Sequence, residues 1–290
     1  MDKFCVITNR EKDTNLEITT RIVDYMNKNK KECILLDGQN PVNCQNRFTD
    51  AKVIPDNTEC AIVLGGDGTI IQAANDLAGK GIPILGINLG TLGFLAETEK
   101  NNIYEALDSL YTGKLSLESR MMLHGSIYSN CKVAYKGTVL NDIVITRSGF
   151  SRIISVSIYV NNEFVDRYRG DGVIISTPTG STGYNLSSGG PVVKPDASIM
   201  IITPICPHTL NSRSIVVSSK DSVKIKIDES KKTQEEEAIA TFDGRMAILL
   251  QAEDIIDISK AKEETKLVKI NHTSFFEILR TKIGQGGDYV

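Results

Sequence analysis

Glycines and one aspartate are concentrated in residues 64–69, which read LGGDGT. The segment joins an apolar run at 60–64, typical of a buried strand, to a run at 70–77 that is typical of a helix. Glycine lets another molecule approach the backbone closely, and a turn into a helix N-terminus presents free amide groups that suit a phosphate. This turn therefore predicts phosphate binding by a set of four residues, Gly65, Gly66, Gly68 and Thr69.

Asp67 stands in the middle of that turn. A carboxylate there would repel a phosphate, so we expect it to hold a metal ion or to take a proton from a hydroxyl group. The alternative is an ordinary tight turn in which the aspartate caps the helix. The spacing matches neither the GxGxxG dinucleotide fingerprint nor the Walker loop, because no Lys-Ser/Thr pair follows.

A second group of candidate residues lies in 167–195, where glycines and hydroxyl side chains are dense around an apolar strand. Backbone and hydroxyl donors of this kind suit phosphate or sugar oxygens. Tyr184 offers a flat face on which a purine could stack. The alternative is a turn-rich loop between two strands.

An adjacent amide and carboxylate, Asn141 and Asp142, stand before an apolar strand. They could bind a ribose diol or a base edge, or they could form only an Asx turn that opens the strand. Of the three histidines, only His208 is expected near a site, and even there a core or turn role is the commoner one. His124 and His272 are interpreted as structural or surface residues.

The composition excludes several classes of protein. The chain has 290 residues, 41% of them hydrophobic and 24% charged, as in soluble globular proteins of one or two domains. A net charge of −3 gives no general attraction to nucleic acid or to anionic lipid. No apolar run is long enough to cross a bilayer, and the N-terminus lacks the apolar region of a signal peptide.

The six cysteines include no Cys-x-x-Cys pair. Those at positions 5, 33 and 60 lie in strand-like runs, where a free cysteine behaves as a small hydrophobic residue. These three are interpreted as reduced core residues, and the expected compartment is the cytoplasm.

Elements that alternate between strand and helix precede residue 117. Strands are expected at 4–8, 33–36, 60–64 and 83–88, helices at 12–28, 70–77 and 103–111, and a loop at 39–57. This pattern predicts a Rossmann-like α/β domain over residues 1–116, with a mostly parallel sheet. Ligands of such sheets bind beyond the carboxyl ends of the strands, where 65–68 and a second glycine-rich loop, 88–94, would both emerge. The second loop could also be a simple turn.

Short alternating runs replace the helical period after that domain. They predict an all-β, sandwich-like domain over 117–260, with a hairpin turn at Asn161-Asn162 and a solvated charged loop at 231–237. The closing segment, 261–290, contains a helix at 274–283 whose apolar face is expected to pack back on the first domain. The expected strands are 123–128, 139–146, 153–160, 173–176, 199–203, 223–227 and 247–251.

Taken together, these segments closely resemble bacterial NAD kinases, in family order across nearly the whole chain. The first glycine turn alone is shared with diacylglycerol-type lipid kinases and, more loosely, with phosphofructokinases. The segment 171–191 and the sequence PICPHTL at 204–210 are much more specific. The matching pieces are 65–69, 88–94, 141–142, 171–191, 204–213, 243–244 and 274–282.

The resemblance implies transfer of the γ-phosphoryl group of ATP to the 2′-hydroxyl of the adenosine ribose of NAD, giving NADP. It further implies a divalent metal, usually Mg²⁺, and commonly a homodimer or homotetramer, and some members accept polyphosphate. By the family pattern Asp67 is the proton acceptor, and Phe94 and Tyr184 lie near the adenine. Arg245 falls where family members often carry Gln or another polar residue. The implied NAD-binding residues are Asp67, Gly68, Phe94, Asn141, Asp142, Arg152, Arg169, Asp171, Thr182, Gly183, Tyr184, Asn185, Leu186, Ser187 and Arg245.

Two other functions use the same glycine turn. A lipid kinase of the diacylglycerol or sphingosine type would need an apolar acceptor groove and membrane affinity, and the sequence contains no basic amphipathic helix or lipid anchor. A non-enzymatic nucleotide sensor would leave Asp67 with a structural role only. The expected partners are therefore small molecules, without nucleic acid and without a membrane.

Overall fold

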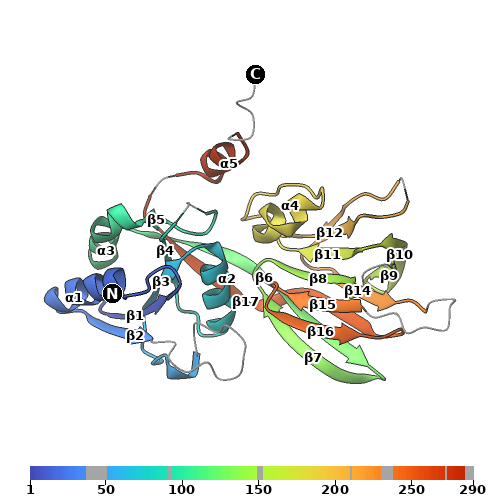
Figure 1. The fold of residues 1–290 in the computed structure, drawn as a ribbon, viewed down its shortest axis with the longest axis horizontal. Coiled ribbons are helices and arrows are strands. Elements are labelled where there is room, and N and C mark those ends of the chain that lie inside the picture. The colour runs from blue at the N-terminus through green and yellow to red at the C-terminus, as the bar shows by residue number, and fades with distance from the viewer. Residues whose placement is uncertain are drawn as a thin grey trace. The chain divides into compact units, whose positions relative to one another are not determined.

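The computed structural model describes residues 1–36, 51–90, 93–148, 153–209, 211–229, 238–271 and 273–284. Contacts divide the chain into two compact units, unit 1 (residues 1–120 and 264–290) and unit 2 (residues 121–263). Two long strands, β6 (Ser116–Ser129) and β17 (Ile255–Lys269), each contribute residues to both units (Figure 1). The domain limits predicted after residues 116 and 260 fall inside these two strands.

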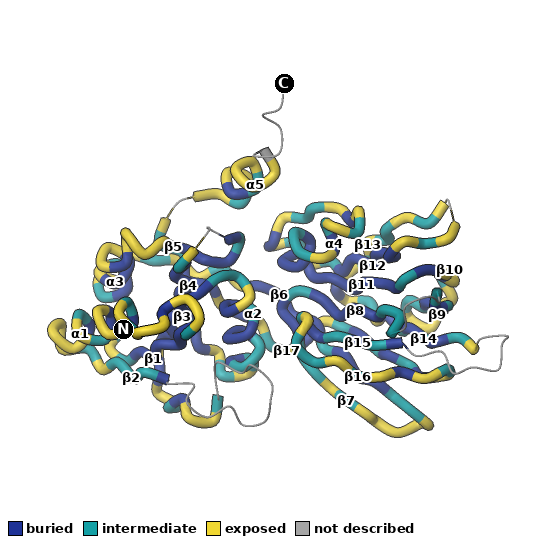
Figure 2. The backbone as a smooth tube through the Cα atoms, in the orientation of Figure 1, coloured by how far each residue is buried: buried dark blue, intermediate teal, exposed yellow. Residues whose placement is uncertain are grey.

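The strands of unit 1 form a parallel sheet from β1 (Lys3–Thr8), β2 (Glu32–Leu36), β3 (Cys60–Gly65) and β4 (Ile84–Asn88). Their order is β4-β3-β1-β2, and the short β5 (Thr98–Glu99) and the end of β17 both pair with β4 in parallel. Every residue of β3 and β4 is buried, as expected for parallel strands covered on both faces (Figure 2). The predicted parallel α/β fold is confirmed.

Helices cover both faces of this sheet. Side chains of α1 (Glu17–Lys28) and α3 (Ile103–Thr112), among them Ile22 and Leu107, pack in one core with Leu85 of β4. The neighbouring Gly86 faces the opposite side, where a Cβ would lie 2.5 Å from Ile70 Cδ1 of α2 (Asp67–Asp76). Two 3₁₀ turns, η1 (Ala51–Val53) and η2 (Lys100–Asn102), complete the unit.

The first helix starts five residues later than predicted, at Glu17 instead of Lys12. Asp13 explains this start, because its carboxylate accepts hydrogen bonds from the amides of Ile18 (3.2 Å) and Thr19 (2.9 Å). A carboxylate that satisfies first-turn amides fixes the N-terminus of a helix. Residues 9–16 are consequently a loop.

Unit 2 consists of two antiparallel sheets that share one apolar core, so the predicted sandwich is confirmed. One sheet has the order β13-β12-β11-β8-β15-β16, and the other contains β10-β9-β14-β17 with β7 and β6. Core side chains come from both, for example Ile175 and Ile225. The strands are β7 (Lys132–Val139), β8 (Asp142–Arg147), β9 (Ile154–Val160), β10 (Glu163–Gly170), β11 (Gly172–Ser176), β12 (Ile199–Ile205), β13 (Ile215–Ser218), β14 (Ser222–Ile227), β15 (Ala238–Phe242) and β16 (Met246–Leu250).

The hairpin predicted at Asn161-Asn162 joins β9 to β10, and both residues have positive φ, 52° and 68°. The strand predicted over 139–146 is wrong as a single element, because β7 ends at Val139 and β8 begins at Asp142. The charged segment 231–237 and most of the loop predicted at 39–57 lie outside the described residues.

The cysteine prediction holds only in part. Cys5 and Cys60 are buried and Cys33 is half-buried, whereas Cys131 and Cys206 are exposed. Both exposed cysteines stand in turns with positive φ, 60° and 43°, which a strand position does not allow. Cys44 lies outside the described residues.

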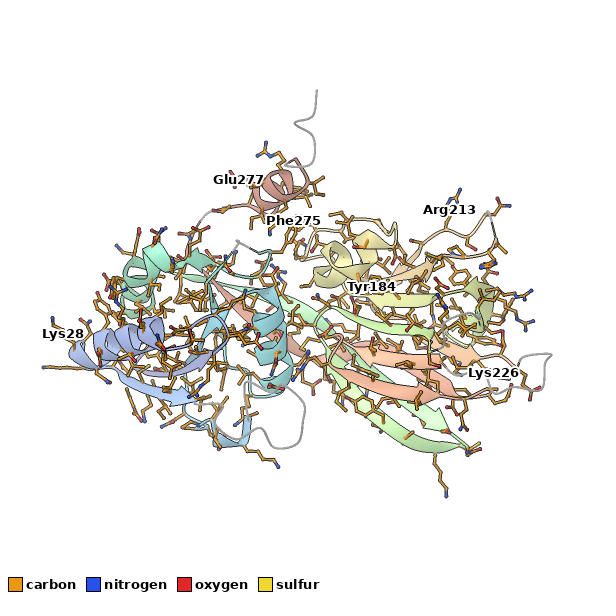
Figure 3. All side chains as sticks on the ribbon, viewed as in Figure 1. Lys28, Tyr184, Arg213, Lys226, Phe275 and Glu277 are labelled. Carbon is orange, nitrogen blue, oxygen red and sulfur yellow. The ribbon has the colours of Figure 1, made fainter. Side chains whose placement is uncertain are left out.

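The last described element is α5 (Phe275–Gly284), which belongs to unit 1 as predicted. A capping box begins the helix, since Ser274 Oγ accepts from the Glu277 amide (3.2 Å) and a Glu277 carboxylate oxygen accepts from the Ser274 amide (2.6 Å). The Phe275 ring lies 6.1 Å from the Phe94 ring (Figure 3). Among the described residues, no helix is long and apolar enough to span a membrane.

Candidate active site

The first glycine turn is closely packed. A Cβ on Gly65 would lie 2.3 Å from Thr69 Oγ1, so only glycine fits at the end of β3. The buried Thr69 hydroxyl in turn accepts a hydrogen bond from Asn9 Nδ2 (3.2 Å). The carbonyl of Gly65 accepts from the Leu89 amide (2.9 Å), which ties this turn to the second glycine loop. The two loops therefore leave the same edge of the sheet, as predicted.

Asp67 does not act as the cap of α2. The N-cap is Gly66, and the half-buried Asp67 carboxylate instead accepts hydrogen bonds from the amides of Phe94 (2.8 Å) and Leu95 (3.1 Å). Each carboxylate oxygen accepts one amide and keeps a second lone pair for another donor. The side chain is thus held in a fixed orientation while it can still accept a proton.

Gly93 makes this contact possible. A Cβ at residue 93 would lie 1.9 Å from Asp67 Oδ1, which is far inside van der Waals contact. Asn88 shapes the start of the same loop, since its side chain donates to the Gly90 carbonyl (2.7 Å) and accepts from the Gly90 amide (3.1 Å). The glycines of the second loop thus let the backbone approach a carboxylate, and residues 91–92 lie outside the described residues.

In unit 2, Asp243 holds the turn that contains Asn141 and Asp142. Its carboxylate accepts hydrogen bonds from three successive amides, those of Leu140 (2.8 Å), Asn141 (2.9 Å) and Asp142 (2.9 Å). The Asp243 amide donates to the Asp142 carbonyl (3.0 Å). Positive φ angles at Asp243 and Gly244, 49° and 65°, allow this approach. The sequence match at 243–244 thus corresponds to a residue that positions the Asn141-Asp142 pair.

Both side chains of that pair carry buried polar atoms. Asp142 is only 7% exposed, and burial, with a smaller contribution from the negative charge of Asp243, raises the pKa of Asp142 to about 7. Asn141 Oδ1 is buried and has no hydrogen-bond partner within the described part of the chain. Because buried polar atoms in folded proteins are nearly always paired, these two side chains are suited to receive a ligand.

The segment after β11 packs on the same turn. Thr177 donates from its amide to the Asn141 carbonyl (2.8 Å) and from its hydroxyl to the Leu140 carbonyl (2.6 Å). A Cβ on Gly180 would lie 2.3 Å from the Asn141 carbonyl oxygen. Residue 180 belongs to the 3₁₀ turn η3 (Thr179–Thr182), which the short helix α4 (Tyr184–Ser187) follows.

Asn185 is one of the residues predicted to bind NAD. Its side chain is completely buried, and its amide donates to the carbonyls of Ser181 (3.2 Å) and Pro191 (3.1 Å). Its oxygen accepts from the Thr203 hydroxyl (2.7 Å). The Asn185 side chain therefore shapes the segment 181–191 from within.

A cavity of about 410 Å³ lies beside this segment. Asp171 lines it and forms an ion pair with Arg147 (2.7 Å between Oδ1 and Nε). Tyr184, 45% exposed on α4, stands at the same cavity (Figure 3). The structure thus brings together the predicted Asp171 and Tyr184, and it adds Arg147. The full lining is Thr146, Arg147, Ser148, Asp171, Tyr184, Ile205 and Cys206.

The other predicted residues are spread over their units. Arg169 is exposed on β10, and its carbonyl accepts from the amide of His208 (2.8 Å), itself exposed. Arg245 stands in the β15–β16 turn, half-buried. His124 contacts the Ser126 hydroxyl (3.3 Å), in keeping with a structural role. Half-buried positions are Phe94, Thr182, Gly183 and Leu186, exposed ones are Gly68 and Ser187, and Arg152 and His272 lie outside the described residues.

Family models match both parts of the chain. The model described as ATP-NAD kinase N-terminal domain matches residues 4–115, and the one described as ATP-NAD kinase C-terminal domain matches residues 140–270. Relatives that match over nearly their whole length are NAD kinases as well. The chain is 55% identical over 287 residues to the NAD kinase of Lachnoclostridium phytofermentans, covering 98% of this chain and 99% of the relative. It is 42% identical over 284 residues to the NAD kinase of Thermoanaerobacter sp., with 98% and 99% covered.

Solved structures have the same fold. The yeast NADH kinase complexed with NADH superposes with a TM-score of 0.83 at 21% identity, covering 100% of this chain and 89% of that one. The NAD kinase from Archaeoglobus fulgidus in complex with ATP gives a TM-score of 0.74 at 25% identity, with 97% and 98% covered. With both family models matched and a relative 55% identical over nearly its whole length, the chain belongs to the NAD kinase family.

Proposed function

We propose that the chain transfers the γ-phosphoryl group of ATP to the 2′-hydroxyl of the adenosine ribose of NAD, with Asp67 as the general base. Membership of the NAD kinase family supports this reaction, and the relatives with NADH and with ATP support the two substrates. The observation that carries the role of Asp67 is its carboxylate, fixed by the amides of Phe94 and Leu95 beside the glycine turn. A lipid kinase or a nucleotide sensor receives no support from these relatives.

The 2′-hydroxyl is a weak nucleophile at neutral pH, so its proton has to leave as the new bond forms. In the proposed step the 2′-oxygen bonds to the γ-phosphorus while the bond from that phosphorus to the β–γ bridging oxygen breaks. The proton passes to a free lone pair of the Asp67 carboxylate, and ADP leaves with the electron pair. The glycine turn and the first turn of α2 offer amide N–H groups to the phosphates.

Unit 2 carries the groups suited to recognise a dinucleotide. The unpaired Asn141 Oδ1 can accept from a ribose hydroxyl or a base amine, and Asp142 can accept from a diol. Tyr184, exposed beside the cavity, offers its ring to an adenine. Two charged side chains line this cavity and are suited to polar contacts with a ligand, the positive Arg147 and the negative Asp171.

We further propose Mg²⁺ as the metal. Within the described residues, no group of three or more His, Cys, Asp or Glu side chains is placed to hold a metal ion. Mg²⁺ keeps several waters and binds through substrate phosphates and one or two carboxylates. Asp67 is the carboxylate of the glycine turn, so with the ATP phosphates it would hold the ion, which would neutralise charge on the transferred group.

The activity is tested by incubating the protein with NAD, ATP and Mg²⁺ and measuring NADP. Parallel reactions replace NAD by NADH or by diacylglycerol vesicles, and ATP by polyphosphate. We expect NADP with ATP as donor. Phosphorylation of the lipid alone, or nucleotide binding without any product, would replace the proposal by one of its two rivals.

Family members also lead us to propose a homodimer or homotetramer in the cytoplasm. Sedimentation of the purified protein measures the first property, and fractionation of the source cells measures the second. A monomer at micromolar concentration, or recovery with membranes, would contradict them.

Gly93→Ala should lower kcat about 10²-fold, because the added Cβ would displace the Asp67 carboxylate, and misplacement by about 1 Å has costs of that size. Gly90→Ala is the matched control in the same loop, since among the described residues its Cβ would meet only Lys12 Nζ, at 3.6 Å, which is ordinary van der Waals contact. The two variants are compared by kcat and by thermal unfolding. Equal kcat values would show that the Asp67 carboxylate does not need this close approach.

A further inference from the structure

Lys12 places its ammonium group between the two glycine loops of unit 1. A Cβ built on Gly66 would lie 2.9 Å from Lys12 Nζ, and one built on Gly90 would lie 3.6 Å from the same atom. A side chain at residue 66 would therefore need the space that the ammonium occupies in this structure. The glycines leave a gap in the backbone surface that the lysine reaches from a third loop, the one after β1.

The backbone of that third loop is fixed to the first glycine turn. Asn9, only 8% exposed, donates from its amide to the Leu64 carbonyl (2.9 Å) and from its side chain to Thr69 Oγ1 (3.2 Å). Its carbonyl accepts from the amides of Lys12 (3.1 Å) and Asp13 (3.0 Å). The buried Asp13 then caps α1 as described above. These bonds hold the Lys12 backbone in place relative to the glycine turn.

The ammonium is also available to a ligand. Within the described part of the chain, the exposed side chain of Lys12 forms neither an ion pair nor a hydrogen bond. Asp67, the acidic residue of the adjacent turn, is directed at the amides of Phe94 and Leu95. A cation that ends against two glycine backbones, at the edge where strands of a parallel sheet end, is suited to an anion with several oxygens.

We propose that Lys12 Nζ binds the β- and γ-phosphate oxygens of the nucleoside triphosphate donor, an inference that rests on the function proposed above. The phosphates carry several negative charges, and the carboxylate of Asp67 adds to them. Lys12 supplies the compensating positive charge from the protein itself. An ammonium group acts here as a point charge on the group in transfer, with no proton exchanged.

The test compares Lys12→Ala and Lys12→Arg with the parent and with Lys28→Ala, a change in the last turn of α1 (Figure 3). Lys12→Ala should lower kcat/KM for ATP by about 10- to 100-fold, the size of a lost charged hydrogen bond. The KM for NAD and the Tm should stay at parental values, since the Lys12 side chain supports no packing. Lys12→Arg should restore part of the loss, and Lys28→Ala should change neither constant.

A second measurement separates this inference from the proposed function. Calorimetry of ATP binding, without NAD, should show weaker binding for Lys12→Ala than for the parent. If Lys12→Ala kept the parental kcat/KM for ATP and the parental affinity for ATP, the role of Lys12 would be overturned and the proposed kinase activity would stand. A parent protein that binds ATP through Lys12 but forms no NADP would overturn the proposed function instead.

Discussion

Asp67→Asn should bind NAD with parental affinity and lose about 10²–10⁴-fold in kcat, the usual size of a general-base contribution. An amide cannot take the proton of the 2′-hydroxyl at neutral pH. Asparagine also keeps only one acceptor oxygen. The amides of Phe94 and Leu95 both donate to Asp67, so one of these two amides loses its partner. The variant should therefore also lose about 1–3 kcal/mol of stability.

Two measurements separate the role of Asp67 as a general base from its role in holding the loop that contains Phe94 and Leu95. Single-turnover phosphoryl transfer gives the chemical step, and thermal unfolding gives the structural cost. Gly93→Ala serves as the comparison, because it disturbs the contact between Asp67 and the loop while keeping the carboxylate. A kcat in Asp67→Asn as high as in the parent would assign Asp67 to loop structure alone.

Asp142→Asn should stabilise the ligand-free protein above neutral pH, by on the order of 4 kcal/mol, while weakening NAD binding. The sign follows from the raised pKa, about 7 in the fold against 3.8 for the ordinary group. Below about pH 4 both folded and unfolded Asp142 hold a proton, so the residue contributes nothing. Between about pH 4 and 7 only the unfolded state ionises, so stability falls as the pH rises, and above 7 the full loss persists.

Urea unfolding between pH 4 and 9 measures this difference. The parent and Asp142→Asn should agree at pH 4 and diverge progressively up to pH 7. Asp24→Asn, which removes an exposed carboxylate of α1, serves as the control and should keep the parental pH dependence. Parallel curves for the parent and Asp142→Asn would mean that Asp142 ionises in the fold as it does in water.

The sequence predicted the elements whose patterns are local. All four strands of the parallel sheet were found, because each contains a continuous apolar run, which is buried in β1, β3 and β4 and mostly half-buried in β2. Among the longer strands, β7, β10, β13, β15 and β17 were missed. In β7 and β10 at least half of the residues are exposed, so no apolar alternation marks these two strands. The start of α1 was misplaced, because the cap that fixes it, Asp13, lies four residues before Glu17 in a loop.

The candidate site shows the same division. Residue types and spacing singled out Asp67, Asn141 and Asp142 as candidates, but they did not show which contacts hold these residues. The carboxylate of Asp243 reaches amides 101–103 residues away in the sequence, and that of Asp67 reaches amides 27 and 28 residues away. Such contacts depend on the register of neighbouring strands, which no local pattern contains. The match at 243–244 was visible in the sequence, but its physical reason was not.

The three amides that converge on Asp243 have a consequence for ligand recognition. A concave row of N–H groups normally attracts a diffusible anion, yet here an internal carboxylate already neutralises it. The Asn141-Asp142 turn, where we propose that NAD binds, is therefore held in one shape without a ligand. A rigid receptor loses little conformational entropy on association, so more of the contact energy appears as affinity.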